Sequence, residues 1–438
     1  MNRTYWFAQA LLAEGWARDV LVRVVDGVIG AVEAGVEPSG ERHAVVVPGM
    51  NNLHSHGFQR AMAGLTERGS GEDSFWTWRE LMYRYLARLT PDDVEAITKL
   101  AYMEMLEGGF ARVGEFHYLH HDIDGTPFGD RAEMAGRVCA AAEATGIGLT
   151  LLPVLYAHSG FGGLAPSEAQ RRFVHSVAAF DDLLDGCRKH VSGDGVVGVA
   201  LHSLRAVTAE EMRAVLARAR GPVHIHIAEQ EKEVTDCVAW SGARPVDWLL
   251  DHAEVGADWC LVHATHVTEA ERGRVARSGA VVGLCPITEA NLGDGVFPVE
   301  AFVGEGGVFG IGSDSNVRID ASEELRLLEY GQRLFLKKRN VVRGLYGKAL
   351  QGGAQALGVK SGIAVGCSAD MVGLDGDHSG LVERAGADVE DGYVFAAGRS
   401  AIDCVWRRGV KVVEGGRHVG RDGIVEDYRK VIRRLREG

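Results

Sequence analysis

Short apolar segments alternate with amphipathic helical segments through the middle of the chain, and this alternation limits the possible folds more than any other feature. The apolar segments have the length of buried strands and are rich in β-branched residues. Eight of them stand at residues 44–47, 112–116, 148–156, 196–201, 222–228, 259–262, 280–284 and 308–311. Helical periodicity fills residues 91–107, 131–145, 167–189, 209–220, 231–251, 269–277 and 322–338. Thr90 and Thr208 have the residue type of helix N-caps at the start of two of these segments.

Eight strands that alternate with helices predict an α/β fold, a (β/α)8 barrel of the TIM type. An open, doubly wound sheet is the alternative arrangement. No Gly-x-Gly-x-x-Gly motif follows the first strand to support that alternative.

Short strand-like segments also occur near both ends of the chain. They stand at residues 7–12, 20–25 and 27–32, and again at 369–374, 393–397, 401–407 and 410–413. We expect the two ends to pair in one small β-sandwich domain outside the main body. The predicted division gives residues 1–45 and 358–438 to this small domain and residues 46–357 to the catalytic barrel.

Composition argues against several classes of protein. The formal charge of −13 disfavours general binding to nucleic acid or to anionic membranes. No stretch approaches the ~18 apolar residues that cross a bilayer, and residues 1–20 lack the basic start of a signal peptide. The seven cysteines are scattered without a Cys-x-x-Cys motif, which favours reduced thiols over disulfides. We therefore expect a cytoplasmic protein with neither nucleic acid nor membrane as a partner.

Polar side chains follow the predicted strands at their carboxyl ends, where barrel enzymes place their chemistry. His54 and His56 follow the first strand, and residues i and i+2 of an extended chain point the same way, so both imidazoles can reach one metal ion. Further candidates at these ends are Gln59, His117, Tyr118, His120, His121, His158, His202, Arg205, His224, His226, Glu229, His263, His266 and Asp314. One such histidine would more often be a packing residue, but a ring of them on one face predicts a metal site.

These residues resemble the ligand pattern of the amidohydrolase superfamily of metal-dependent deaminases and hydrolases. The pattern consists of His54-Ser55-His56, a histidine after the fifth strand with Glu229 three residues later, His263 after the sixth and Asp314 after the eighth. The resemblance covers residues 44–340. No lysine lies in residues 196–205, where binuclear members carry a carboxylated lysine. The chain therefore resembles the mononuclear branch, which mostly hydrolyses C–N bonds with loss of ammonia.

A narrower resemblance joins the chain to the bacterial formimidoylglutamate deiminases of histidine degradation. Residues 52–64, with the sequence Asn-Leu-His-Ser-His-Gly-Phe-Gln-Arg-Ala-Met-Ala-Gly, are similar to the first-strand motif of that group. Residues 224–230 and 312–316 are similar to its later motifs. Asn51 and Gly57 stand where the group has Pro and Ala, and neither position carries a ligand.

The resemblance implies one Zn²⁺ per subunit, with Fe²⁺ also possible, and assigns roles to the residues around it. The implied metal ligands are His54, His56, His226 and Asp314, and His224 remains a rival to His226 because both share one face of a strand. Glu229 would carry a proton from the attacking water to the departing nitrogen. His263 would hold the attacking hydroxide, and Asp314 would assist in deprotonation.

The substrate implied is N-formimidoyl-L-glutamate, a small dicarboxylate amidine, with N-formyl-L-glutamate and ammonia as products. Arg205 and Arg79 are the candidates to bind its carboxylates, because an arginine pairs with a carboxylate in a two-pronged contact. Gln59, Tyr118 and His202 would add hydrogen bonds. Arg79 has a competing interpretation as part of a loop, residues 72–79, that is packed by its tryptophans. The long segment before Thr90 suggests a lid or an interface, and the family tends to form homodimers.

Two other functions remain open at this point. One is a mononuclear zinc deaminase of a purine, a pterin or another aromatic base, which needs a flatter and more apolar pocket. The other is a metal-binding scaffold without catalysis, against which the presence of Glu229 and His263 beside a full ligand set argues.

Overall fold

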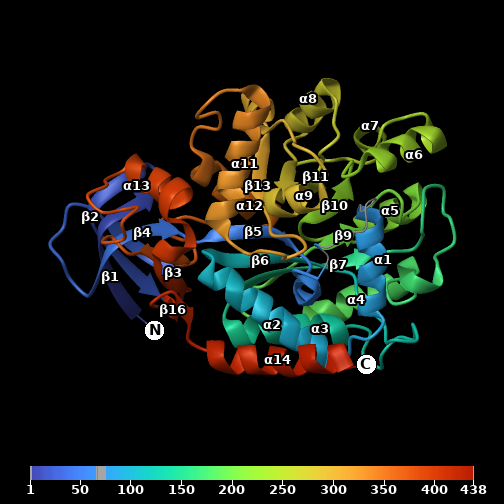
Figure 1. Cartoon of the computed structure of the whole chain (residues 1–438), viewed down its shortest axis with the longest axis horizontal. Helices are drawn as coiled ribbons and strands as arrows, with labels where there is room; N and C mark the ends of the chain where they lie inside the picture. Colours follow the sequence, from blue (N-terminus) through green and yellow to red (C-terminus); the bar gives the residue numbers. More distant parts are fainter. Residues whose placement is uncertain (1, 66, 68–74, 438) are drawn as a thin grey trace.

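Two sheets organise the chain in a computed structural model that describes residues 2–65, 67 and 75–437 (Figure 1). Nine strand segments form a parallel barrel, and eight strands from both ends of the chain form a second sheet beside it. Part of the predicted loop 72–79, at residues 72–74, lies outside the described residues. From residue 75 onward the chain is helical, in α1 (Phe75–Leu86).

The barrel closes through parallel neighbours, since β6 pairs with both β5 and β7. Its strands are β5 (Met50–Ser55), β6 (Phe110–His117), β7 (Gly148–Leu155), β8 (Val196–Val197), β9 (Val199–Leu201), β10 (Val223–Ile227), β11 (Trp259–His263), β12 (Val281–Leu284) and β13 (Val308–Ile311). The short segments β8 and β9 together form one barrel strand, which is interrupted at Gly198. Both segments pair with β7. The predicted (β/α)8 barrel is therefore confirmed, and the open sheet is excluded.

The first barrel strand differs from the prediction. Residues 44–47 belong to β4 (Glu41–Pro48), which pairs with β1 and β14 of the second sheet. The barrel begins with β5, after Gly49, whereas the predicted barrel began at residue 46. Residues 45–55 are all buried in the structure. A strand that is buried on both faces shows no alternation of polar and apolar residues, so no such pattern marks where β4 ends and β5 begins. A Cβ at residue 49 would lie 2.5 Å from Ala111 Cβ, so only glycine allows this close turn between the sheets.

Helices cover the barrel strands on the outside (Figure 1). They are α2 (Pro91–Glu107), α3 (Glu133–Thr145), α4 (Val177–His190), α5 (Ala209–Leu216), α6 (Glu231–Ser241), α7 (Pro245–His252), α8 (Glu269–Ser278), α9 (Pro286–Leu292), α10 (Val299–Gly304), α11 (Ala321–Leu336) and α12 (Leu345–Ala356), with short helical turns η1 (Gly57–Met62) and η2 (Glu168–Gln170). The predicted N-caps are confirmed, because Thr90 accepts a hydrogen bond from the Asp93 amide and Thr208 accepts one from the Glu211 amide. None of the described helices is both long and apolar enough to cross a lipid bilayer.

The second sheet joins the two ends of the chain, as predicted. It contains β1 (Asn2–Leu12), β2 (Gly15–Val25), β3 (Val28–Glu33), β4, β14 (Met371–Leu374), β15 (Ile402–Arg407), β16 (Val410–Glu414) and β17 (Arg417–His418). A bridge from Val28 to Ser368 brings the β3 edge back toward β14, so the sheet folds over its own core of Tyr5, Phe7 and Trp406. The predicted strand 393–397 is wrong: these residues form η3 (Tyr393–Ala397), between α13 (Ala387–Gly392) and η4 (Gly398–Ala401).

The last helix, α14 (Arg421–Glu437), leaves the second sheet and lies against α2 of the barrel (Figure 1). Val431 and Leu435 are buried there, and Arg434 forms an ion pair with Asp93 at the start of α2. The prediction that residues 358–438 belong entirely to the small domain therefore needs correction for α14. This helix packs on the barrel because one of its faces carries apolar residues at helical spacing.

Candidate active site

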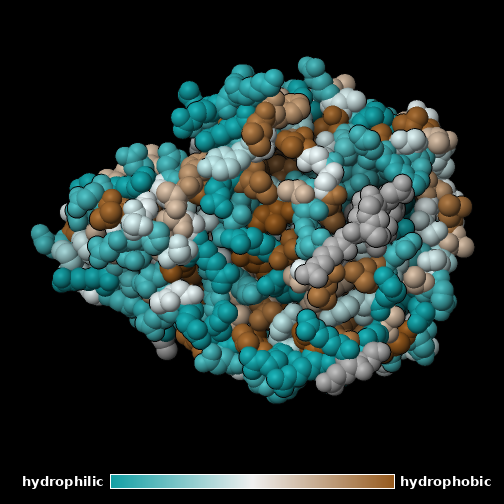
Figure 2. All heavy atoms as spheres, in the orientation of Figure 1, coloured by the Kyte–Doolittle hydropathy of each residue, from teal (hydrophilic) through white to brown (hydrophobic). Residues whose placement is uncertain are grey.

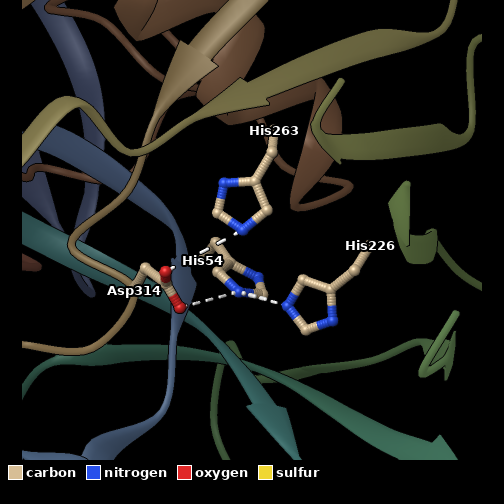
Figure 3. Close-up of side chains that lie close together, drawn as sticks. All are labelled: His54, His226, His263 and Asp314. Carbon is tan, nitrogen blue, oxygen red and sulfur yellow. Dashed lines mark hydrogen bonds and ion pairs between the residues drawn. The ribbon is translucent and has the colours of Figure 1, made fainter. Parts of the chain in front are cut away.

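Five side chains converge at the carboxyl ends of the barrel strands. His54 and His56 come from the end of β5, His226 from β10, His263 from β11, and Asp314 follows β13. The ligand atoms of His54, His226, His263 and Asp314 all lie within 4.8 Å of one another, and Figure 3 shows these side chains pointing toward a common centre. The Nε2 atoms of His54 and His56 are each 3.3 Å from Asp314 Oδ1. All five side chains are buried.

Backbone carbonyls fix the tautomers of two of these histidines. The Nδ1 atom of His56 is 2.9 Å from the Phe116 carbonyl oxygen, and Nδ1 of His226 is 3.0 Å from the His202 carbonyl oxygen. A carbonyl only accepts hydrogen bonds, so each Nδ1 carries the hydrogen and each Nε2 offers a lone pair to the centre. Nε2 of His226 lies only 3.0 Å from Nε2 of His54. A cation between them would use both lone pairs.

The protonation states of these groups suit a metal centre. Burial lowers the pKa of His54 to about 3 and the pKa of His226 well below its usual value, so both imidazoles are neutral. Burial opposes ionisation of Asp314, but its contacts with His54, His56 and His263 hold its pKa below the usual range. Neutral imidazoles with one carboxylate form a ligand set that zinc and iron both accept. The residues present therefore fit the predicted metal.

The backbone is held in an unusual conformation where these side chains turn inward. His263 and Asp314 have φ angles of 68° and 43°, in the left-handed region that non-glycine residues rarely adopt. Ala228, just before Glu229, has a φ angle of 50°. Each such residue costs roughly 1–2 kcal/mol, so the surrounding fold keeps these side chains aimed at the centre.

Glu229 and His263 form the acid–base part of the site. The Nε2 atom of His263 is 3.9 Å from Glu229 Oε1 and 3.8 Å from Asp314 Oδ2. Burial raises the pKa of Glu229 to about 7, which is where a group can both accept and return a proton at neutral pH. Burial opposes the charging of His263, but Glu229, Glu289 and Asp314 together raise its pKa to about 10. His263 is therefore a hydrogen-bond donor at this position.

Sequence reasoning missed two carboxyl groups next to this pair. Glu289 of α9 lies with Oε1 3.2 Å from Nδ1 of His263, and the same oxygen accepts a hydrogen bond from the Cys285 amide at 2.9 Å. Asp294 accepts a hydrogen bond from the Gln230 side chain. Burial and the charge of Glu229 raise the pKa of Asp294 to about 8. Both residues follow β12, the seventh strand of the barrel. No histidine stands directly after this strand in the sequence, so its carboxyl end was not predicted to be part of the site.

All five predicted substrate residues line one pocket beside the converging side chains. Gln59, Arg79, Tyr118, His202 and Arg205 share it with Glu229, His263 and Asp314, and with several aromatic side chains. Gln59 Nε2 donates a hydrogen bond to the Tyr118 hydroxyl at 2.9 Å. Arg79 belongs to α1, not to a loop, and its guanidinium lies 5.7 Å from the ring centre of Tyr83. Arg205 Nη2 is 3.9 Å from Glu233 Oε2.

The remaining candidate histidines have other contacts. His224 lies deeper in the barrel, where its Nε2 is 2.7 Å from the Ala356 carbonyl oxygen, and it is not part of the ligand cluster among the residues described. His120 and His121 contact the backbone carbonyl oxygens of Val154 and Val174. His158 forms an ion pair with Glu211. These contacts support packing roles.

Comparison with protein families gives two matches. The model of the amidohydrolase family matches residues 45–412, and the model of the N-terminal domain of the formimidoylglutamate deiminase HutF matches residues 6–44. Together these matches span both the barrel and the first strands of the second sheet.

Known proteins similar to the chain agree with these matches. A formimidoylglutamate deiminase of Pseudomonas aeruginosa is 50% identical over 444 residues, covering 98% of each chain. An 8-oxoguanine deaminase of the same species is 30% identical over 359 residues, covering 77% of this chain and 76% of the relative. The crystal structure of an amidohydrolase from Brucella melitensis superposes with a TM-score of 0.95 at 52% identity, covering 99% of both chains.

Proposed function

Because this chain belongs to the amidohydrolase family, we propose that it hydrolyses N-formimidoyl-L-glutamate to N-formyl-L-glutamate and ammonia. The observation that carries the proposal is the full-length similarity to the formimidoylglutamate deiminase of Pseudomonas aeruginosa. The chain is a hydrolase that acts on a carbon–nitrogen bond. One water adds to the formimidoyl carbon, and the terminal nitrogen leaves as ammonia, so atoms balance without another reactant.

The metal that supports this reaction is proposed to be one Zn²⁺ per chain, with Fe²⁺ as the alternative. His54, His56, His226 and Asp314 would hold it, because their donor atoms face one point. A bound metal ion of this kind lowers the pKa of water and so supplies a nucleophile near neutral pH.

Glu229 and His263 divide the proton transfers between them. Glu229 Oε1 accepts a proton from the attacking water and delivers it to the terminal nitrogen, which then leaves as neutral ammonia. The imidazolium of His263 donates a hydrogen bond through Nε2 and stabilises the oxygen that gains negative charge. Glu289 holds the other nitrogen of His263, so the ring keeps this orientation.

Two arginines give the pocket its affinity for a dicarboxylate. Both arginines line the pocket. Arg205 comes from the loop after β9, and Arg79 comes from α1. Their guanidinium groups would each pair with one substrate carboxylate, and burial strengthens such pairs. Gln59, Tyr118 and His202 would add hydrogen bonds near the formimidoyl end.

We also propose that the enzyme works as a cytoplasmic homodimer. The seven cysteines are all unpaired, which suits a reducing compartment. On the surface, Tyr330, Leu334 and Phe335 of α11 are 39%, 80% and 68% exposed, and exposed apolar groups of this size support an interface. On the face shown in Figure 2, hydrophilic residues dominate the rim and hydrophobic residues show mainly in the middle. Sedimentation of the purified protein measures the oligomeric state directly.

Ammonia release by the zinc-loaded protein tests the reaction. N-formimidoyl-L-glutamate should release ammonia rapidly, and adenine, guanine and cytosine should not. Glu229→Gln should lower kcat by about 10²–10⁴-fold, since a positioned general base contributes that much. Glu231→Gln is the matched control, because Glu231 is exposed two residues further on and should leave kcat unchanged.

Arg205→Gln separates the dicarboxylate substrate from an aromatic one. Loss of a carboxylate partner should raise KM for N-formimidoyl-L-glutamate by at least tenfold. Turnover of a purine, with little effect of Arg205→Gln, would replace the proposed substrate and keep the barrel and its metal. Binding of zinc without turnover of any amidine or base would leave only the scaffold interpretation.

A further inference from the structure

A second group of metal-ligating side chains lies in the sheet formed by the two ends of the chain. The ligand atoms of His43 on β4 and of Asp403 and Cys404 on β15 all lie within 4.8 Å of one another. Zinc bonds of about 2.0–2.3 Å in a tetrahedron place neighbouring ligand atoms about 3.3–3.8 Å apart. Small side-chain rotations therefore suffice to close this group around an ion.

The sheet is irregular at this place, and the irregularity brings the three side chains together. Gly373 of β14 pairs with Cys404, but Leu374 pairs with Ile402, so Asp403 is an extra residue in β15. Such a bulge changes the direction of side chains along a strand, and here it sets the Asp403 carboxylate beside the Cys404 thiol. The thiol donates a hydrogen bond to Asp403 Oδ2 at 3.1 Å.

His43 reaches the same place by packing against Trp406, whose indole lies over Gly373 of β14. A Cβ there would lie 2.9 Å from Trp406 Cζ3, so glycine leaves room for the indole ring. The imidazole of His43 packs edge-on against this indole, with ring centres 4.7 Å apart. Its Nε2 is 2.9 Å from Glu41 Oε1, so this carboxylate lies next to the group of three, outside the 4.8 Å limit that its members share.

The chemistry of the four groups selects a particular class of ion. Cys404 is 2% exposed, so its sulfur lies inside the sheet. A sulfur, a nitrogen and carboxylate oxygens form the mixed set that zinc and cobalt prefer, whereas magnesium and calcium require oxygen alone. Lys411 Nζ lies 2.8 Å from Glu41 and 3.3 Å from Glu414, so Glu414 can retain this cation when Glu41 turns toward a metal.

We propose that His43, Asp403, Cys404 and Glu41 form a second metal site, for zinc or a similar thiolate-binding divalent ion, in the terminal sheet. Binding breaks the S–H bond of Cys404, forms a metal–sulfur bond and releases the proton to solvent. The site joins β4 to β15 across β14. It therefore links the first and last thirds of the chain and adds to the stability of the sheet, independently of catalysis.

Cobalt substitution distinguishes this site from the catalytic one. The catalytic cluster offers nitrogen and oxygen ligands but no thiol, so a near-ultraviolet thiolate-to-cobalt band can come only from a cysteine elsewhere. The metal-depleted full-length protein, titrated with Co²⁺, should bind two ions per chain and develop this band. Cys404→Ser should bind one ion, lose the band and keep its turnover of the substrate.

Two further variants make the result decisive. Cys139→Ser, at a cysteine in the barrel helix α3, should retain both ions and the band. His43→Gln should weaken binding of the second ion at least tenfold even if Cys404→Ser fails to fold. Binding of one ion without the band by the unmodified protein, or a band that persists in both Cys404→Ser and His43→Gln, would overturn the proposal.

Discussion

Glu324 is a buried carboxyl group whose ionisation opposes folding. It stands in the first turn of α11, is 0% exposed, and its Oε2 accepts a hydrogen bond from the Ile287 amide at 2.9 Å. Its other oxygen has no hydrogen-bond partner among the described residues. Burial, reinforced by Glu289 and Asp320, raises the pKa of Glu324 well above 4.5. The folded chain thus keeps a proton that the unfolded chain loses.

Glu324→Gln should therefore stabilise the protein at neutral pH. A raised folded-state pKa means that stability is full below the unfolded pKa of 4.5 and declines as pH rises toward the folded pKa. The amide keeps the acceptor for Ile287 and removes this decline, which is at most about 1.4 kcal/mol per pH unit. Urea unfolding at several pH values measures the difference between the two proteins.

Glu323→Gln is the matched control for this prediction. Glu323 is the neighbouring residue on α11 and forms ion pairs with Arg318 and Arg326 near the surface. Its replacement should change the free energy of unfolding by less than about 0.5 kcal/mol. A stability difference for Glu324→Gln that does not grow with pH would contradict the assigned protonation.

Single residues also mark what a sequence can and cannot specify. His54, His56 and Asp314 were predicted from the strand ends they follow, and the structure brings them together. His224 and His226 share one face of β10, so their spacing alone cannot tell which reaches the centre. Depth along the strand decides it, since His226 lies near His54 and His224 contacts Ala356. The position of a residue along the barrel axis depends on how all the strands pair around the barrel, and a local sequence pattern does not contain this information.

At the scale of single elements, the start of α5 supports the loop that carries two proposed substrate contacts. The Thr208 side chain accepts a hydrogen bond from the Glu211 amide, and Glu211 in turn accepts one from the Thr208 amide at 2.8 Å. The loop between β9 and this cap contains His202 and Arg205. The cap therefore fixes both the helix and the end of that loop.

Thr208→Ala should destabilise the protein by about 1 kcal/mol, the usual cost of losing a threonine N-cap. KM for the proposed substrate should rise more than kcat falls, because the loop would hold Arg205 less firmly. Thermal unfolding and steady-state kinetics measure the two effects. Thr235→Ala, in the middle of α6 with its hydroxyl bonded to the Glu231 carbonyl, is the control and should change stability by less than about 0.5 kcal/mol. Equal effects of both variants would contradict a role for the cap.

Elements were easier to predict than the boundaries between sheets. The seven later barrel strands follow their predicted segments closely, because each is a short apolar run between helices. The first segment was wrong because β4 and β5 form one continuous buried stretch that crosses from one sheet to the other at Gly49. Sheet membership depends on distant partners such as β14, which the local sequence does not reveal.

At the scale of the whole molecule, a cluster of two buried arginines and two partly buried carboxylates joins the two sheets. Asp194, in the loop before β8, accepts hydrogen bonds from Arg407 of β15 at 2.6 Å and 2.8 Å. It also forms an ion pair with Arg112 of β6, and Arg407 forms another with Asp370. The side chains of both arginines are 4% exposed. One carboxylate of the barrel thus pairs with an arginine from each sheet.

Asp194→Asn should destabilise the protein by about 3 kcal/mol, because the buried Arg112 loses its carboxylate partner while Arg407 keeps Asp370. Burial opposes ionisation of Asp194, but Arg407 and Arg112 lower its pKa below 3.8. The stabilisation by Asp194 is therefore full above pH 3.8 and is lost as pH falls through the lower folded pKa. Asp185→Asn is the control, since Asp185 is 72% exposed and pairs with Arg188 one helical turn away, so its loss should cost less than about 0.5 kcal/mol. Urea unfolding at pH 7 compares the variants, and similar losses for both would show that the sheets are joined by their apolar contacts and not by this cluster.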